Sequence, residues 1–399
     1  MKLIKHIRDP IHGTIPLNEV ELELLDTPQV QRMRHIKQNG LCFLVYPAMN
    51  STRFEHSLGV MYIAGLIAEN LELSDDDRIK LEVAGLLHDI GHCPFSHTSD
   101  DVLIEMGHSH EELSIHLIRE TTISDILKKH GIDPRAISEL INGRGKLGKI
   151  ISSEIDADKM DYLIRDSYYA GVAYGVIDMD RIIQGIKLVK GEVVVKRGSL
   201  EAVESLLISR NMMYETVYRH HTKRIVEAMF KAALNKLIRD KQLTYREFIK
   251  MDDIDLVYKL RNTGGYPGDM MERIDKRKLF KTAYSERLSL VDEGFREDLV
   301  GGRVNIQDKI AQDYAIDEGY LLLDIPETKM SEFKILVEGA DGELKLINEV
   351  SELAGTLEKT EREKITFGIY TPKEKLPNLA GFNAERYIEF SQTRLGRYM

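Results

Sequence analysis

The sequence predicts a mainly α-helical protein with a helical-bundle core and a small C-terminal α+β subdomain. Apolar residues recur at helical spacing over most of the chain from Asn18 to Leu237, whereas strand-like runs begin at Tyr320. The length of 399 residues exceeds the roughly 250–300 at which a single hydrophobic core stops growing. We therefore expect a large domain over residues 1–265 and a smaller one over 266–399, divided near the stretch RNTGGYPGD.

The composition is that of an ordinary globular protein, with 43% hydrophobic and 30% charged residues. The net charge of −10 argues against broad electrostatic binding to nucleic acid or to an anionic membrane. Two cysteines provide no disulfide framework, and neither a signal peptide nor a long apolar span is evident. We expect a cytoplasmic protein that binds neither membranes nor nucleic acid.

The N-terminal part should form short strands and then helices. The segment IRDPIHGTIPL places Asp-Pro and His-Gly turn chemistry among short apolar pieces, which favours short strands or irregular structure. Helical spacing begins at Asn18, breaks at Asp26 to Pro28 and then resumes. A long apolar helix is expected from Phe54 to Leu71. Ser74 is a capping signal for the next helix, which should end just after His88-Asp89.

Four residues within this helical pattern could bind one metal ion. His56, His88, Asp89 and Asp158 supply two imidazoles and two carboxylates, a donor set that suits a divalent ion such as Mn, Fe, Zn, Ni or Mg. Their separations along the chain are too long for a zinc-finger loop, so the ligands must converge from separate helices in the bundle core. The neighbouring carboxylates Asp156 and Asp161 are expected to be solvated or locally hydrogen-bonded.

The later part of the chain should change from helices to strands. A small hairpin is expected around Lys190-Gly191, and helix is expected from Glu201 to Leu237. An acidic helical segment should reach about Gln312. Strands are then expected in YLLLDIP, FKILVEG, ELKLI and ITFGIY, with a turn at Asp341-Gly342 and a helix near residues 349–357.

The segments around the four ligands resemble a known family. DPIHG, DTPQVQRMRHIKQ, RFEHSLGV, LLHDIGHCPFSH and DADKMDYLIRDS are similar to the HD-domain metal phosphohydrolases, in the dNTP triphosphohydrolase branch that includes the vertebrate SAM-and-HD-domain dNTPase. The resemblance runs from about Lys5 to Lys281. It implies that residues 1–265 are an HD-type catalytic domain with an N-terminal regulatory segment, and that one divalent metal ion serves hydrolysis of a deoxynucleoside triphosphate to deoxynucleoside and triphosphate.

The resemblance also implies roles for individual residues. Those expected around the scissile phosphate are His92, His97, His110 and Glu111, with Arg53, Lys159 and Arg210 as clamps for phosphate oxygens. His110 or His92 would act as the acid and base. The remaining substrate-binding positions are Gln38, Tyr162, Asp166, Tyr214 and Tyr218. Tyr218 matches a tyrosine that crowds the sugar 2′ position, and Gln38 with Asp166 would bind the 3′-hydroxyl, which predicts a preference for deoxyribose.

Two positions depart from the vertebrate pattern. Tyr214 stands where a histidine is expected, and Asn39 stands where an apolar residue would pack against the sugar.

A second, regulatory nucleotide site is also implied by the resemblance. Lys5, Asp26, Gln31 and Arg34 match positions of a nucleotide site apart from the active centre, and Arg277 and Lys281 match basic residues contributed by neighbouring subunits. Such residues could read a guanine edge and neutralise triphosphate charge between subunits of an acidic protein. We therefore expect a homo-oligomer, a dimer or a tetramer, that responds to GTP or a dNTP.

Two other classes of function remain open at the level of sequence. The first is a different HD-enzyme reaction, either a nucleotide phosphatase or a phosphodiesterase. The two-metal phosphodiesterases are disfavoured because ligands for only one metal are evident, although His92 and His110 could serve a second ion. The second class is a non-catalytic nucleotide sensor or nucleic-acid-binding module, against which the intact set of four ligands counts.

Overall fold

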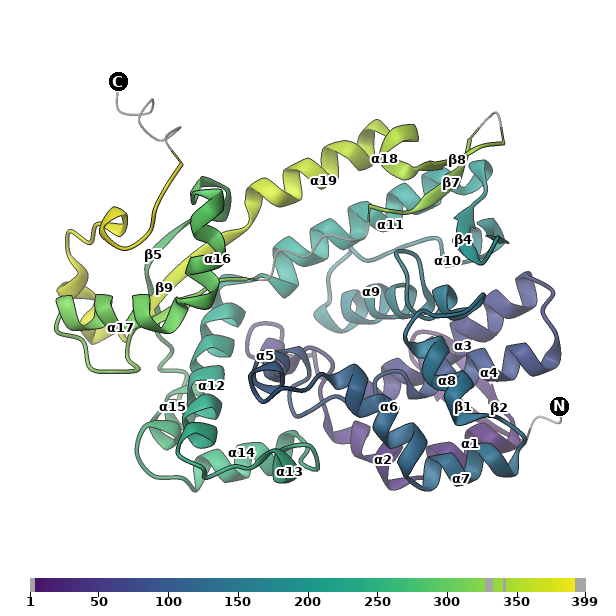
Figure 1. Ribbon diagram of the computed structural model, residues 1–399, viewed down its shortest axis with the longest axis horizontal. Coiled ribbons are helices and arrows are strands. Elements are labelled where there is room, and N and C mark those ends of the chain that lie inside the picture. The colour runs from purple at the N-terminus through teal and green to yellow at the C-terminus, as the bar shows by residue number, and fades with distance from the viewer. Residues whose placement is uncertain (1–3, 327–332, 340–341, 392–399) are drawn as a thin grey trace. The chain divides into compact units, whose positions relative to one another are not determined.

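The computed structural model describes residues 4–326, 333–339 and 342–391, and helices dominate it (Figure 1). The predicted mainly α-helical fold is confirmed. The chain forms two compact units, each assembled from separated segments. The first unit contains residues 1–219, 244–256 and 331–357, and the second contains residues 220–243, 257–330 and 358–399. These compact units do not test the domain boundary that was expected after residue 265, which stays a prediction.

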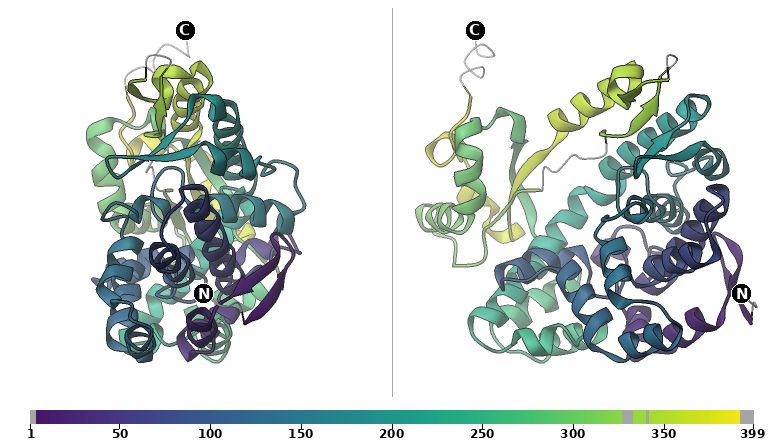
Figure 2. Two further views of the ribbon diagram at one scale, coloured as in Figure 1. Left: turned by 90° about the vertical axis from the view of Figure 1, so that its right-hand side faces the viewer. Right: turned by 45° about the vertical axis from the view of Figure 1, so that its right-hand side comes forward.

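The first unit begins with the expected short strands. Strands β1 (Lys5–Asp9) and β2 (Gly13–Leu17) form an antiparallel hairpin, the purple pair of arrows in Figure 2. The helices that follow in this unit are α1 (Glu19–Leu25), α2 (Pro28–Arg32), α3 (Arg53–Asn70), α4 (Asp75–Leu87), α5 (His97–Glu105), α6 (His110–Glu120), α7 (Thr122–Lys129), α8 (Pro134–Ile141), α9 (Ala157–Ala170), α10 (Met179–Gly185) and α11 (Leu200–Met213).

Helices α3, α4 and α9 form the centre of the first unit. Helix α3 begins after Thr52, which forms a capping box with Glu55, and α4 begins after Ser74, whose hydroxyl accepts a hydrogen bond from the Asp77 amide as predicted. Glycine allows α3 and α9 to approach closely, because a Cβ at Gly59 would lie 1.8 Å from Asp161 Oδ1. The first turns of α3 and α9 lie close to each other and to the end of α4.

The strands of the C-terminal region divide between two sheets. One sheet belongs to the first unit and has the order β3 (Ile186–Val189), β4 (Glu192–Val195), β7 (Leu336–Glu338) and β8 (Leu344–Leu346). The predicted hairpin is its β3-β4 edge. Strand β7 pairs in parallel with β4, with Val194 opposite Leu336, a long-range pairing that local strand patterns cannot predict. The expected turn at Asp341-Gly342 includes Asp341, which lies outside the described residues.

The expected helix from Glu201 to Leu237 is interrupted. Helix α11 passes into a π-helical turn, η5 (Tyr214–Tyr218), and α12 (His221–Arg239) then begins anew. A π-helical turn inserts an extra residue into the helical repeat and commonly marks a functional site. The carbonyl of Thr216 in this turn accepts a hydrogen bond from Tyr46 Oη at 2.7 Å.

The second unit is built from α12, three further helices and a three-stranded sheet. The helices are α15 (Tyr266–Asp275), α16 (Glu293–Gly301) and α17 (Arg303–Asp313). The sheet has the order β5 (Lys281–Arg287), β9 (Thr366–Thr371) and β6 (Leu322–Asp324). Apolar side chains of β6, β9 and α17 form its core, among them Leu323, Phe367 and Ile310. Helices α14 (Asp253–Arg261) and α19 (Glu352–Lys364) each have residues in both units, and the short helices α13 (Tyr245–Phe248) and α18 (Ile347–Val350) belong to the first.

None of the helices in the described part of the chain combines the length and apolar character needed to cross a membrane. Both cysteines are buried, and neither forms a disulfide bond within the described residues.

Candidate active site

The four predicted metal ligands lie together in the first unit. His56 is in the first turn of α3, His88 follows the last turn of α4 with Asp89 beside it, and Asp158 is in the first turn of α9. His56 Nε2 lies 3.0 Å from Asp158 Oδ1 and 3.5 Å from Asp89 Oδ2, and His88 Nε2 lies 3.4 Å from Asp89 Oδ1. The ligand atoms of His56, His88 and Asp158 are all within 4.8 Å of one another. Two imidazoles and the Asp158 carboxylate thus converge, and Asp89 lies beside both imidazoles.

The histidines are oriented for metal binding by their other ring nitrogens. His56 Nδ1 lies 2.8 Å from Asp161 Oδ2, and His88 Nδ1 lies 2.8 Å from the carbonyl oxygen of Gly85. Donation from Nδ1 leaves the lone pair of Nε2 free to coordinate an ion. Both Nε2 atoms are buried and form no hydrogen bond within the described residues. Buried polar atoms without partners are costly, so the donor set fits a divalent metal ion.

Asp161 contacts the ring of His56 on the side away from the proposed metal site, a role that the sequence did not suggest. Its carboxylate is fully buried and accepts hydrogen bonds from Arg165 Nε and Nη2 at 2.8 and 2.9 Å. The Nε2 atom of His12 lies 2.6 Å from Asp161 Oδ1. Arg165 also donates a hydrogen bond through Nη1 to Asp9 Oδ2 at 2.9 Å. Asp161 is therefore neither solvated nor merely local. Asp156 does act locally, because it caps α9 by accepting from the Lys159 amide at 2.7 Å.

Arg53 is positioned to add positive charge beside the metal ligands. Its Nη1 pairs with Asp89 Oδ2, and its Nε donates to Ser96 Oγ at 2.9 Å. The third nitrogen, Nη2, is buried without a hydrogen-bond partner among the described residues. A guanidinium with one unused donor next to a metal site is suited to binding a phosphate oxygen.

A cluster of histidines surrounds one half-buried carboxylate, Asp100, which the sequence did not single out. His97 Nδ1 lies 2.9 Å from Asp100 Oδ2, while His110 Nδ1 and His92 Nδ1 lie 3.4 and 3.6 Å from Asp100 Oδ1. The rings of His92 and His110 stack with centroids 4.0 Å apart. His92 Nε2 lies 3.2 Å from Asp89 Oδ1, which joins this cluster to the metal ligands. Only the spacing of His97 and Asp100 on one helix face could have suggested Asp100.

The histidines of this cluster differ in charge. Burial, together with the charges of Arg53 and His110, lowers the pKa of His92 to about 4, so His92 is neutral near pH 7. Burial would also lower the pKa of His110, but hydrogen bonding to Asp100 and the charge of Asp100 outweigh it and raise that pKa. Glu111 lies beside His110, with Oε1 3.4 Å from His110 Nε2. His110 can therefore hold a proton that His92 cannot.

A second polar cluster lies two turns along α9 from Asp158. Asp166 is buried, and its two oxygens accept hydrogen bonds from Asn39 Nδ2 and Tyr218 Oη, each at 2.7 Å. Burial raises the pKa of Asp166 to about 6, against the hydrogen bond from Tyr218. Gln38 is also buried, and its Oε1 has no hydrogen-bond partner in the described chain. Asn39, which departs from the family pattern, thus occupies one oxygen of Asp166.

Tyr218 of the π-helical turn, which bonds to Asp166, belongs to a group of aromatic and basic side chains. The ring of Tyr218 is 5.1 Å from that of Tyr214 and 6.3 Å from that of Tyr162. The Tyr214 ring also meets two guanidinium groups, with Arg210 Cζ 4.2 Å and Arg219 Cζ 5.1 Å from its centroid. These contacts place the predicted aromatic and arginine positions together.

The Lys159 ammonium does not reach towards the metal ligands. It bonds to Asp156 Oδ2 at 3.1 Å and to the Ser153 carbonyl at 2.8 Å. An ammonium group has three donors, so these two bonds do not test its expected role as a phosphate clamp, which stays a prediction.

The residues expected to form a regulatory site are exposed or half-buried. In the first unit, Arg34 Nε donates to Gln31 Oε1 at 2.9 Å, and its Cζ lies 3.6 Å from the Phe54 ring centroid. Lys5 and Asp26 are exposed. In the second unit, Arg277 and Lys281 are exposed, and Lys281 begins β5. The role of these residues stays a prediction.

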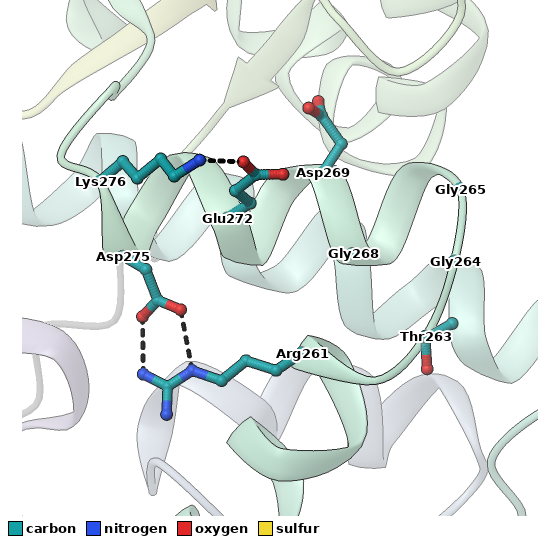
Figure 3. A pocket seen from close by; sticks show the side chains of 9 residues that line it. All are labelled: Arg261, Thr263, Gly264, Gly265, Gly268, Asp269, Glu272, Asp275 and Lys276. Carbon is teal, nitrogen blue, oxygen red and sulfur yellow. Dashed lines mark hydrogen bonds and ion pairs between the residues drawn. The ribbon is translucent and has the colours of Figure 1, made fainter.

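A separate hollow of about 490 Å³ lies in the second unit, at the start of α15 (Figure 3). Its walls carry Arg261, Asp269, Glu272, Asp275 and Lys276. These charges are already paired: Arg261 binds Asp275 through two hydrogen bonds of 2.8 Å, and Lys276 pairs with Glu272. The hollow therefore offers no chemistry comparable to that of the metal site.

Comparison with family models defines the class of protein. The HD domain matches residues 53–166, a range that begins at Arg53 and ends at Asp166, and the HD associated region matches residues 177–396. The chain belongs to the HD-domain phosphohydrolase family, as the sequence motifs indicated.

More narrowly, the chain is similar to uncharacterized HD proteins and to dNTP triphosphohydrolases. An uncharacterized protein of Methanocaldococcus jannaschii is 40% identical over 96% of this chain and 83% of its own length. Deoxynucleoside triphosphate triphosphohydrolase SAMHD1 of Homo sapiens is 30% identical over 64% of this chain, which spans about half of that relative's length, 49%. A phosphohydrolase from Bacteroides thetaiotaomicron, known from its crystal structure, has 25% sequence identity to this chain and a TM-score of 0.75. The match covers 93% of this chain and 100% of that one.

Proposed function

We propose that this protein is a metal-dependent deoxynucleoside triphosphate triphosphohydrolase, which releases a deoxynucleoside and triphosphate. The observation that carries the proposal is the stripe of polar residues on α9. Asp158 of the metal-ligand set and Asp166 of the second polar cluster are separated by two helical turns and lie on one face of the helix. A substrate with its phosphate at the ligands would extend its sugar towards Asp166. The similarity to SAMHD1 supports the same assignment.

The residues around the ligands have the chemistry that phosphoester hydrolysis needs. His56, His88, Asp89 and Asp158 would hold one divalent ion. When bound, the ion supplies Lewis-acid polarisation of the phosphoryl oxygens. Arg53 stabilises the negative charge that develops on those oxygens through its unused Nη2.

Proton transfer at this site falls to the histidine cluster. A water oxygen bonds to the α-phosphorus as the bond from phosphorus to the sugar 5′-oxygen breaks. The attacking water gives up one proton, for which the neutral His92 is the acceptor, and the departing oxygen gains one. His110 is the donor, because Asp100 raises the pKa of His110 and the His110 side chain is partly exposed. His92 is neutral and buried against Asp89, so it is suited to accept hydrogen bonds.

The sugar side supports a preference for deoxyribose. The ring of Tyr218 is held by its hydrogen bond to Asp166, and a fixed aromatic wall at the 2′ position excludes a hydroxyl by crowding it and leaving it unpaired. Turnover of a panel of dNTPs, rNTPs and monophosphates in the presence of Mn, Mg, Fe or Ni tests this. We expect dATP to be hydrolysed faster than ATP, and equal rates would contradict the preference.

One observation favours a second candidate, a two-metal phosphodiesterase. His92, His97 and Asp100 form another group whose ligand atoms lie within 4.8 Å of one another. A second ion there would compete with the role of His110 as proton donor. Metal analysis separates the two: one ion per chain fits the triphosphohydrolase, whereas two ions with hydrolysis of a nucleotide diester would favour the alternative.

We further propose that a nucleotide controls assembly into a dimer or tetramer. Arg34 and Gln31 are exposed or half-buried and could bind a GTP or dNTP activator, with Arg277 and Lys281 supplied by another copy of the chain. Arg34 stacks on Phe54, the neighbour of Arg53, so displacement of its guanidinium by an activator would be felt next to the metal ligands. Binding between chains would stabilise the oligomer by mass action.

A further inference from the structure

A buried carboxylate, Asp253, connects two loops that flank the metal site. Only 5% of Asp253 is exposed. Its Oδ2 accepts a hydrogen bond from the Lys37 amide at 2.9 Å, and its Oδ1 accepts one from the Phe95 amide at 2.6 Å. The adjacent Asp252 caps the start of α14 instead, because its Oδ1 accepts from the Ile254 and Asp255 amides at 2.8 and 3.0 Å. The Asp253 side chain is therefore committed to other segments of the chain.

The two amides belong to two loops, one carrying residues proposed for the sugar and the other residues proposed for the phosphate. Lys37 directly precedes Gln38 and Asn39, of which Asn39 bonds to Asp166. Phe95 lies between His92 and His97 of the histidine cluster. One carboxylate thus ties the sugar-side loop, residues 37–39, to the phosphate-side loop, residues 92–97.

The phosphate-side loop has a backbone that needs such support. Phe95 and Ser96 have φ values of +61° and +52°, in the left-handed region that residues other than glycine rarely adopt. Such a conformation persists only where its surroundings hold it. The second tie is Ser96, whose Oγ donates to the Lys37 carbonyl at 2.8 Å and accepts from Arg53 Nε at 2.9 Å.

The segment that carries Asp253 makes one more bridge to the same loop. Arg32 Nη1 donates to the Met251 carbonyl at 2.7 Å, and its Nη2 donates to the His92 carbonyl at 2.7 Å. Residues 251–253 thus hold the phosphate-side loop at two points, at His92 through Arg32 and at Phe95 directly.

We propose that Asp253 is a positioning residue of the active site, which aligns the sugar-side loop with the phosphate-side loop around a bound substrate. Asp253 touches neither a metal ligand nor the place of the reacting atoms, so its effect passes through the backbone of Lys37 and Phe95. The inference rests on the proposed function for the identity of the substrate. It concerns a residue outside the range matched by the HD domain.

Asp253→Asn tests this with little change in volume. One carboxylate oxygen becomes an amide donor that faces a backbone N–H, so one hydrogen bond is lost and two donors oppose each other. Asp252→Asn is the matched control, because the asparagine oxygen can still cap α14. Asp253→Ala, which removes both acceptors without adding a donor, is the second variant and should behave like Asp253→Asn.

Two measurements on the full metal-loaded chain decide the matter. In hydrogen exchange, peptides covering residues 36–41 and 93–98 should exchange at least about tenfold faster in the Asp253 variants, as expected when a buried amide loses its hydrogen-bond acceptor. In hydrolysis of saturating dNTP, kcat should fall at least about tenfold at a temperature where circular dichroism shows a fully folded chain with unchanged metal content. Asp252→Asn should stay within about twofold in both.

The outcomes separate this inference from the proposed function. If the wild-type chain hydrolyses no dNTP, the proposed function fails, while the exchange comparison still decides the alignment of the loops. Unchanged exchange in folded Asp253 variants would overturn the inference, and so would faster exchange with unchanged kcat. A uniform loss of stability, with kcat preserved below the unfolding transition, would reduce Asp253 to a structural residue.

Discussion

Asp158 is the ligand whose removal tests the metal site most cleanly. It faces His56 and lies partly exposed, whereas Asp89 also pairs with buried Arg53, so Asp89→Ala would leave an unpaired buried charge. Asp158→Ala should lose both bound metal and hydrolysis while keeping its helicity. Metal analysis and circular dichroism check this, and full metal occupancy in the variant would rule out the assigned ligand set.

Asp161 should affect the metal without touching it. Asp161→Asn weakens the bond that orients His56 and leaves Arg165 and His12 short of a partner charge. Removing such outer support typically costs 10–100-fold in metal affinity, and we expect a loss of about that size. Competition with a chelator measures it, with the exposed Asp125→Asn as control. Equal affinity in the two variants would contradict the role.

Loss of the His110 proton should make kcat fall at high pH. Its pKa is raised above the usual 6.5 by Asp100, against the effect of burial, so the protonated donor is present below this raised pKa and is lost as pH rises through it. The kcat should fall on the alkaline side, and His110→Gln should lower kcat by about 10²–10⁴-fold and abolish that fall. A pH profile of kcat decides this. An alkaline limb that survives in His110→Gln would assign the proton to another group.

At the scale of residues, the sequence identified candidate ligands that do lie close together, but it did not identify the residues that support them. His56, His88, Asp89 and Asp158 stand in motifs whose residue types alone indicate metal chemistry. Asp161, Asp100 and His12 are ordinary residues in the sequence, and their roles arise from contacts between segments far apart in the chain. Those contacts are set by packing, which residue spacing does not determine.

At the scale of elements, the π-helical turn is the feature that most concerns specificity. A regular helix was expected through residues 214–218, but the turn presents Tyr214 and Tyr218 side by side and joins Tyr218 to Asp166. Helical spacing predicted the α3, α4 and α9 helices well, because capping residues and apolar stripes are local signals. The π turn and the parallel β4-β7 pair depend on distant partners, so local patterns could not predict them.

Tyr218→Ala tests this element directly. Removal of the ring should open the 2′ position and lower the ratio of kcat/KM for dATP to that for ATP by roughly tenfold or more. The exposed Tyr168→Ala on α9 is the control. An unchanged ratio in Tyr218→Ala would show that another group selects the sugar.

At the scale of the whole molecule, the prediction concerns assembly. Arg34→Ala and Lys281→Ala should each weaken the response of oligomer mass and activity to GTP or a dNTP, because each removes a charge that would neutralise the triphosphate. Metal content should be unchanged, since neither residue contacts a ligand. Light scattering with parallel hydrolysis assays over an activator titration measures both effects. A fully active monomer that ignores nucleotides would contradict the proposal.

We propose that hydrolysis occurs at the α-phosphate of a deoxynucleoside triphosphate bound at the site of His56, His88, Asp89 and Asp158. Phosphorus NMR of the products formed from dGTP or dATP by the metal-loaded chain tests it most directly. We expect the resonances of inorganic triphosphate to appear in step with the loss of substrate, with no monophosphate or pyrophosphate released first. Stepwise release of inorganic phosphate, or of pyrophosphate together with a nucleoside monophosphate, would contradict the claim.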